Sequence, residues 1–141
     1  MLPSLEELGA RRTETESYRD GKVDYYLVSE TASFSSGIQR LVDGSKKLKI
    51  ALMCSEKDPL TCHRTILVSR HLRDFVGSIQ HILSDGKIES HKDAEMRLVK
   101  ECKLQNQDFL VSDRERLELA YKRRGEKIAF EDNSNEGEAD G

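Results

Sequence analysis

The chain has 141 residues, of which 36% are hydrophobic and 35% charged, and its formal net charge is −3. This length suits one domain, and the slightly acidic balance argues against a strongly basic nucleic-acid-binding surface. No apolar run approaches the roughly 18 residues that a membrane span needs, and the N-terminus lacks the apolar centre of a signal peptide. Three cysteines, without the dense spacing of a secreted scaffold, predict a cytoplasmic protein with reduced thiols.

The two ends of the chain are polar. Residues 1–20 show little hydrophobic patterning and predict a weakly structured N-terminal segment. Residues 131–141 read EDNSNEGEADG; they lack large apolar side chains and predict a disordered acidic tail. Residues 21–130 are therefore expected to form the folded domain.

The first half of this domain alternates between helical and strand patterns. Apolar residues at i, i+4, i+7 and i+8 predict a helix that Gly44 ends; they are Phe34, Ile38, Leu41 and Val42. Residues 48–54, LKIALMC, form a short apolar run whose length favours a buried strand over a helix. Residues 62–76 then predict a helix that stops at Gly77.

The second half continues the alternation. Residues 78–83, SIQHIL, predict a second strand, with Asp85-Gly86 as a turn. Residues 91–104 predict a helix. Ser112 and Glu115 have the spacing of a capping box, and the helix that follows them has an apolar face of Leu117, Ala120 and Tyr121.

These elements predict an α/β fold. Strand, helix and strand within residues 48–83 have the length of a βαβ unit, and residues 127–131, KIAFE, predict a terminal strand. We therefore expect a small, mostly parallel sheet with flanking helices, a Rossmann-like three-layer arrangement. Ligands tend to bind outside the carboxyl ends of such strands, and Cys54 lies at one of these ends.

The residues that follow this strand carry reactive groups. Asp58 and Pro59 suit the start of a helix, which places Cys62 and His63 in its first turn. A thiolate at that position has a lowered pKa because of the helix dipole, and a neighbouring cation lowers it further. Arg64 offers a guanidinium that binds phosphate or carboxylate groups.

Three interpretations of this corner compete. In the first, Cys62 or Cys54 is a nucleophile with a histidine as its partner, and Glu56 is a general acid or base. In the second, both cysteines bind a metal such as zinc together with His63 or His81, although their spacing matches no familiar zinc motif. In the third, the cysteines only pack and cap, because free cysteine is among the most buried residue types.

The remaining histidines and the third cysteine predict ordinary structural roles. His81 lies in the second predicted strand as a half-buried residue, although a parallel sheet would bring it beside Cys54. His71 and His91 are expected on solvated faces. Cys102 lies on an apolar helix stripe and is expected in the core.

Three segments resemble the family known as domain of unknown function 488: LMCSEKDPLTCHR, VGSIQHILSDGKIESH and LELAYKRRGEKIAF. That family shows an apolar strand ending in Cys-x-Glu, then a Pro, then Cys-His-Arg opening a helix. The corresponding residues here are Cys54, Glu56, Pro59, Cys62, His63 and Arg64. The likeness covers roughly residues 1–131, and its most specific part is the Cys-His-Arg block.

The resemblance implies an α/β fold in which six residues converge on one site: Cys54, Glu56, Cys62, His63, Arg64 and His81. It supplies no activity, because the family has none assigned. The chain lacks the strand and the Asp-Val-Arg segment with which family members begin, so it resembles the C-terminal part of the domain. We therefore expect exposed sheet surface that forms a homodimer or pairs with the missing N-terminal half.

These inferences give a specific hypothesis. The chain is an uncharacterised domain that acts as a cysteine-dependent enzyme on a small anionic or phosphate-bearing ligand, a nucleotide included. Cys62 is the thiolate, Arg64 binds the anion, and Glu56 or His81 carries the proton. Cys54 lines the site or forms a reversible disulfide with Cys62. The alternative is a metal-binding or ligand-binding module, or an interaction domain, without turnover.

Overall fold

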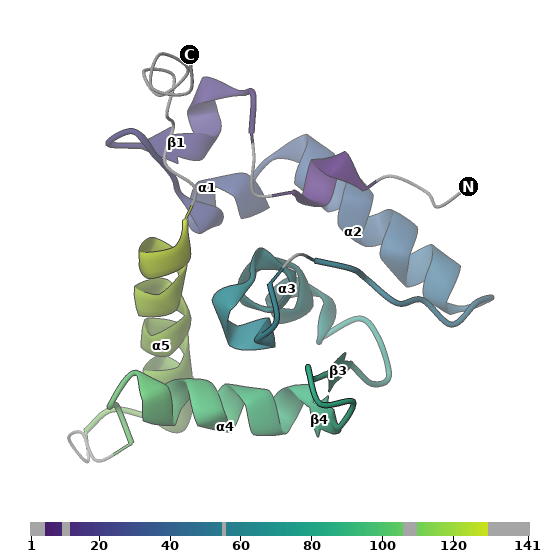
Figure 1. Ribbon diagram of the computed structural model, residues 1–141. Coiled ribbons are helices and arrows are strands. Elements are labelled where there is room, and N and C mark those ends of the chain that lie inside the picture. Colours follow the sequence, from purple (N-terminus) through teal and green to yellow (C-terminus); the bar gives the residue numbers. More distant parts are fainter. Residues whose placement is uncertain (1–4, 10–11, 55, 106–109, 130–141) are drawn as a thin grey trace, which may run out of the picture.

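The computed structural model describes residues 5–9, 12–54, 56–105 and 110–129, and its elements are mainly helical. Figure 1 shows α3 near the middle of the molecule, with α2, α4 and α5 around it. The two short hairpins, β1–β2 and β3–β4, lie on opposite sides of this helical group. The predicted tail, residues 131–141, falls outside the described residues.

The hairpin near the N-terminus is short and tightly turned. Strand β1 (Tyr18–Arg19) pairs antiparallel with β2 (Lys22–Val23). The two residues between them, Asp20 and Gly21, have φ values of 53° and 78°. Positive φ at both central residues is what a tight hairpin turn needs, and glycine takes it without steric cost. The hairpin leads directly into α1 (Tyr25–Ser29).

The segment before this hairpin contains two short 3₁₀ helices, η1 (Glu6–Leu8) and η2 (Thr15–Ser17). Arg12 is buried between them and connects the segment internally. Its guanidinium donates to the Glu7 carbonyl oxygen at 2.6 Å and to the Glu14 carboxylate at 2.8 Å from Nε. The described residues of the predicted weakly structured segment are therefore tied together by a buried cation.

Helix α2 (Ala32–Ser45) follows the pattern that its sequence predicts. Thr31 caps it by accepting a hydrogen bond from the Phe34 amide at 3.2 Å. Its buried face packs on η1, and Gly37 lets the two elements approach closely. A Cβ atom at Gly37 would lie 2.8 Å from the Leu8 side chain, so a larger residue there would push η1 away.

The middle of the molecule is a helical segment with two forms of winding. After the 3₁₀ turn η3 (Pro59–Thr61), the π-helical η4 (Arg64–Ser69) continues into α3 (Arg70–Leu72). We call η4 and α3 together the central helix. Every residue from 65 to 69 is buried, so this helix is covered on all sides by its neighbours. It ends earlier than the predicted helix over residues 62–76.

The second hairpin and the last two helices form the C-terminal part of the described chain. Strand β3 (Gln80–Ile82) pairs antiparallel with β4 (Ile88–Ser90), and Gly86 turns between them with φ of 84°. Helix α4 (His91–Glu101) follows β4 without a break. Helix α5 (Asp113–Ile128) begins at the predicted capping box, which is confirmed.

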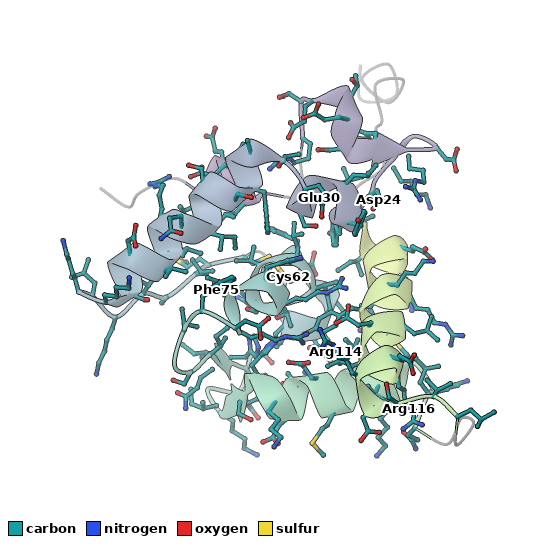
Figure 2. The ribbon with its side chains drawn as sticks, turned by 180° about the vertical axis from the view of Figure 1, so that it is seen from behind. Asp24, Glu30, Cys62, Phe75, Arg114 and Arg116 are labelled. Atoms are coloured by element: carbon teal, nitrogen blue, oxygen red, sulfur yellow. A yellow bond between two sulfur atoms is a disulfide. The ribbon has the colours of Figure 1, made fainter. Side chains whose placement is uncertain are left out.

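One core joins all these elements. The central helix, α4 and α5 contribute many of the fully buried side chains, and α1, α2 and η1 close the core from the N-terminal side. The largest of these side chains are Tyr121, Phe34, Leu60, Ile66, Leu67, Leu98 and Leu104. Figure 2 shows side chains filling the space between the helices, with Cys62 near the middle of the molecule.

The predicted mostly parallel, Rossmann-like sheet is wrong. Within the described residues the two sheets have two strands each, and both are antiparallel. Residues 48–54 form no strand there, with a bend at Leu48, and β3 pairs with β4 instead. A strand needs a neighbour of its own to become part of a sheet, and the cleft described below separates these two segments.

The predicted terminal strand over residues 127–131 is wrong for its described part, which begins as helix. Lys127 and Ile128 complete the last turn of α5, and residues 130 and 131 lie outside the described part of the chain. Among the described helices, none has both the length and the apolar character needed to cross a membrane.

Candidate functional site

The corner between residues 54 and 64 begins with a local cap. Asp58 accepts a hydrogen bond from the Leu60 amide at 3.0 Å, and Pro59 occupies the first position of η3, as the sequence predicts. Cys62 ends η3 in an extended conformation. Its carbonyl oxygen then accepts from the Thr65 and Ile66 amides at 3.1 and 3.2 Å, so Cys62 also caps the central helix. Two turns therefore meet at one cysteine.

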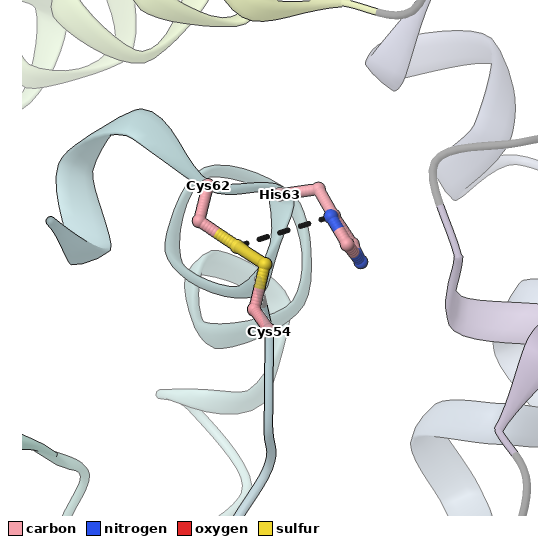
Figure 3. A group of neighbouring side chains, drawn as sticks. All are labelled: Cys54, Cys62 and His63. Atoms are coloured by element: carbon pink, nitrogen blue, oxygen red, sulfur yellow. Dashed lines mark hydrogen bonds between the residues drawn. A yellow bond between two sulfur atoms is a disulfide. The ribbon is translucent and has the colours of Figure 1, made fainter. Parts of the chain in front are cut away.

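The sulfur of Cys62 is joined to the sulfur of Cys54 in a disulfide. Figure 3 shows Cys54 at the end of the extended segment, with Cys62 and His63 at the start of the central helix. Cys62 is 1% exposed, whereas Cys54 is half-buried. The Arg64 amide lies 3.4 Å from the Cys62 sulfur and donates to it. Cys54 is therefore the more accessible of the two cysteines, and the Cys62 sulfur has a hydrogen-bond donor.

His63 lies beside this pair. Its Nδ1 is 3.9 Å from the Cys62 sulfur, and one ligand atom from each of Cys54, Cys62 and His63 lies within 4.8 Å of the others. Burial, followed by the nearby charge of Arg64, lowers the pKa of His63 below its usual value. The ring is therefore neutral at neutral pH, with a lone pair available for a proton or a metal ion.

Arg64 and His81 line a different feature, which we call the edge cleft. This cleft has a volume of about 660 Å³ and lies between residues 48–52 and residues 77–82. His81 is 4% exposed, and its pKa is lowered to about 4 by burial, then by His91 and Arg64. Arg64 is thus the residue that belongs both to the disulfide corner, through its amide, and to the cleft, through its lining position.

A buried polar chain continues inward from His81. His81 Nε2 lies 3.0 Å from His91 Nδ1, and His91 Nε2 lies 3.1 Å from the Tyr121 hydroxyl and 3.0 Å from a Glu95 carboxylate oxygen. If His91 donates from Nε2 to Glu95, its Nδ1 must accept, so His81 donates to it. The prediction of a solvated His91 is wrong, because Ser90 caps α4 and turns His91 inward against α5.

Two other predicted residues lie apart from the sulfurs. Glu56 is exposed, and no ion pair joins it to the part of the chain that the structure describes. Cys102 is a free, half-buried thiol on α4 whose sulfur donates to the Ala120 carbonyl oxygen at 3.7 Å. Of the six predicted site residues, the geometry brings Cys54, Cys62 and His63 into one group, with Arg64 adjoining it.

An ion-pair cluster that sequence reasoning missed joins this corner to the rest of the fold. Arg97 of α4 donates to Asp58, Glu89 and Glu101 at 3.0, 2.9 and 2.8 Å. Arg124 of α5 donates to the Leu60 carbonyl oxygen at 3.0 Å. Two arginines from different helices thus position η3, and with it Cys62.

The fold and the site define a small, mainly helical domain with a cysteine and histidine corner at the start of its central helix. Residues 3–71 match the family described as Domain of unknown function DUF488. The resemblance to this family that the sequence predicted is confirmed over these residues. Searches of curated proteins and of solved structures gave no match.

The extent of the family match corrects one expectation. The match covers the N-terminal part of the chain, so the expectation that the chain corresponds to the C-terminal part of the domain is wrong. Cys54, Cys62, His63 and Arg64 lie inside the matched residues, and His81 lies outside them. The family assignment brings no activity with it, so function must be argued from the site.

Proposed function

We propose that this chain is a cysteine-dependent redox domain in which Cys54 and Cys62 interconvert between a disulfide and two thiols. The observation that carries this proposal is the bonded pair of sulfurs with a neutral imidazole 3.9 Å from one of them. The substrate we propose is a small anionic disulfide or thiol. This is the cysteine chemistry predicted for the corner, now with both thiols taking part.

The different exposure of the two sulfurs assigns their roles. An incoming thiolate attacks the accessible Cys54 sulfur, and the S–S bond breaks to release Cys62 as a thiolate. A second thiol then attacks the mixed disulfide. In sum, two thiols and the protein disulfide give one small disulfide and two cysteine thiols, and two electrons move into the protein. The Arg64 amide at 3.4 Å supports negative charge on the Cys62 sulfur.

His63 is the best-placed proton carrier for this exchange. Because its pKa is lowered, the neutral ring accepts a proton from the Cys62 thiol in the oxidising direction and returns it in the reducing direction. His81 is engaged with His91, and Glu56 is exposed to solvent. Arg64 is the proposed anchor for an anionic group of the substrate.

Equilibration in glutathione buffers of graded redox ratio tests the proposal. Thiols that remain reduced are then alkylated with a mass tag. As the buffer becomes more oxidising, Cys54 and Cys62 of the wild-type protein should lose their tags together, because one disulfide forms and two electrons leave the protein. Cys54→Ser should abolish this transition. Cys102→Ser is the matched control, because Cys102 lies outside the corner, and it should leave the transition unchanged. A wild-type protein that forms no bond between Cys54 and Cys62 at any ratio would contradict the proposal.

The anion anchor has a separate test. Arg64→Gln should slow exchange with oxidised glutathione, which carries carboxylates, by about tenfold, as expected for loss of a charge-assisted contact. Exchange with the neutral 2-hydroxyethyl disulfide should stay the same. Equal slowing with both reagents would mean that Arg64 acts on the thiols and not on the anion.

A second candidate is a metal site in the reduced protein. The three ligand atoms of Cys54, Cys62 and His63 lie within 4.8 Å of one another, close to the spacing around a tetrahedral zinc ion once the sulfurs separate. Reduced protein titrated with Co²⁺ would show sulfur-to-metal charge-transfer absorption if this site forms. His63→Gln should raise the Co²⁺ concentration needed to reach that absorption while leaving disulfide formation possible, so the two candidates give different results.

A further inference from the structure

Two of the chain segments that line the edge cleft, residues 49–52 and strand β3, have backbone groups available for pairing. Residues 49–54 form neither helix nor strand, and their amides and carbonyls make no backbone hydrogen bond to any described residue. Strand β3 uses one edge to pair with β4, and its residues also line the cleft. Unpaired strand edges of this kind are templates for a further strand. The geometry therefore leaves room for a chain that hydrogen-bonds to backbone.

Apolar side chains around the cleft are exposed in the absence of such a chain. Leu48 is 69% exposed and Ile82 is 65% exposed, and both line the cleft, as do Ile50 and Ile88. Exposed apolar groups that gather along one groove mark binding surfaces more often than scattered ones do. An extended chain with apolar side chains would cover them.

The positive charge of the cleft favours bound chains that carry a negative charge. Lys49 and Arg64 are the two side chains with a fixed charge among the described lining residues, and both are positive. Neither has an ion-pair partner in the described part of the chain. A carboxylate on the bound segment would therefore find two cations and no competing acid.

We infer that the edge cleft binds an extended peptide strand of another protein, apolar in its alternate side chains and carrying a carboxylate. The strand would lie between residues 49–53 and β3 and join them through backbone hydrogen bonds, as in other cases of strand addition. A second copy of this chain is a poorer occupant, because its own extended segment brings Lys46, Lys47 and Lys49 toward the same positive cleft. The inference shares Arg64 with the proposed redox function but needs no cysteine chemistry, and its tests do not alter Arg64.

A labelled peptide tests this inference. The probe is a fluorescein-labelled octapeptide of alternating Val and Thr with one Glu in its middle. We expect saturable binding by fluorescence anisotropy, and slower hydrogen exchange of the amides at residues 49–53 and 79–82 when the peptide is bound. The same peptide with Lys in place of Glu should bind about fivefold more weakly, and Lys49→Glu should reverse this preference.

Two controls make the test decisive. A probe with the same side chains but N-methylated alternate amides should lose about tenfold in affinity, because it lacks the donors along one edge. Ile82→Ser should weaken binding without affecting the fold, since Ile82 is exposed. The inference fails if N-methylation changes nothing, or if no probe binds at about 1 mM, the weakest range of specific association. It also fails if the same amides become protected only as the protein dimerises, which would make the occupant a second copy.

Discussion

Apolar side chains are buried in the helical interior of this protein but exposed along its sheet edge. In the interior, made of the central helix, α4 and α5, residues 65–69 are all buried. At the edge, made of residues 48–54 and β3–β4, Leu48, Met53 and Ile82 are exposed. A helix satisfies its own backbone and needs only packing, whereas a strand needs a neighbour. Apolar composition alone therefore does not decide which segment is buried.

Core truncation gives the largest expected contrast between the two regions. Leu67 is 0% exposed in the central helix, so Leu67→Ala should lower the free energy of unfolding by about 3 to 4 kcal/mol, for lost burial and a new cavity. Leu48→Ala removes the same atoms at the edge, and its effect should be within about 0.5 kcal/mol. Urea unfolding of both variants measures this difference. Similar losses would mean that the edge is packed in solution.

Acid should destabilise the interior through His81, whose side chain points into it from β3. Its folded pKa is lowered to about 4, against an ordinary value of 6.5. Above pH 6.5 the ring is neutral in both states. Between 6.5 and 4 the unfolded chain binds the proton first, so stability falls as the pH falls, by up to about 3 kcal/mol, and then levels off.

His81→Gln provides the comparison for this pH effect. Glutamine keeps a hydrogen-bonding group next to His91 and does not titrate, so the acid-dependent loss between pH 6.5 and 4 should shrink. Chemical unfolding at a series of pH values measures both proteins. An unchanged slope in the variant would assign the effect to another group of the buried chain.

The sequence predicted the interior better than the edge, and the reason is the range of the interactions. The period of Phe34, Ile38 and Leu41 and the capping pair Ser112 and Glu115 are local, so α2 and the start of α5 follow from a few neighbouring residues. Pairing of residues 48–54 depends on what lies beside them in space. A short apolar run has the composition of a strand whether or not a partner exists.

The same distinction between local and distant interactions applies to the candidate site. Cys62, His63 and the cap at Asp58 are adjacent in the chain, so their proximity could be predicted. The contact between His91 and Tyr121 joins residues 30 positions apart and exists because α4 packs on α5. The exposed position of Glu56 likewise depends on the course of the chain in space and not on neighbouring residues. The sequence therefore predicted which reactive side chains are present, but it did not predict whether each one faces the core or the solvent.

Reduction of the disulfide tests how far the edge depends on its attachment to the interior. The bond closes a loop with a sequence separation of 8, and the loss of this constraint should cost about 2.5 kcal/mol of stability by the loop-entropy relation. A reducing agent should therefore lower the urea midpoint of the wild type and leave Cys54→Ser unchanged. A midpoint that moves equally in both proteins would point to Cys102 or to an unrelated effect.

The smallest expected effect comes from Arg97, which joins the corner to α4. Arg97→Met keeps the length of the side chain but removes the hydrogen bonds to Asp58, Glu89 and Glu101, and it should cost about 1 kcal/mol because the cluster is partly exposed. Burial acts to raise the pKa of Asp58, but hydrogen bonds from Arg97 and from the Leu60 amide outweigh it and lower the pKa.

The Asp58 carboxylate therefore reports on this connection directly. Its stabilising contribution is present above its unfolded pKa of 3.8 and is lost as the pH falls through the lower folded value. In Arg97→Met the folded pKa of Asp58 should rise, which an NMR titration of its side-chain carbon resolves. An unmoved pKa would show that the Leu60 amide alone holds the cap. In that case the interior would position Cys62 through Arg124 and the Leu60 carbonyl, and the corner would be independent of α4.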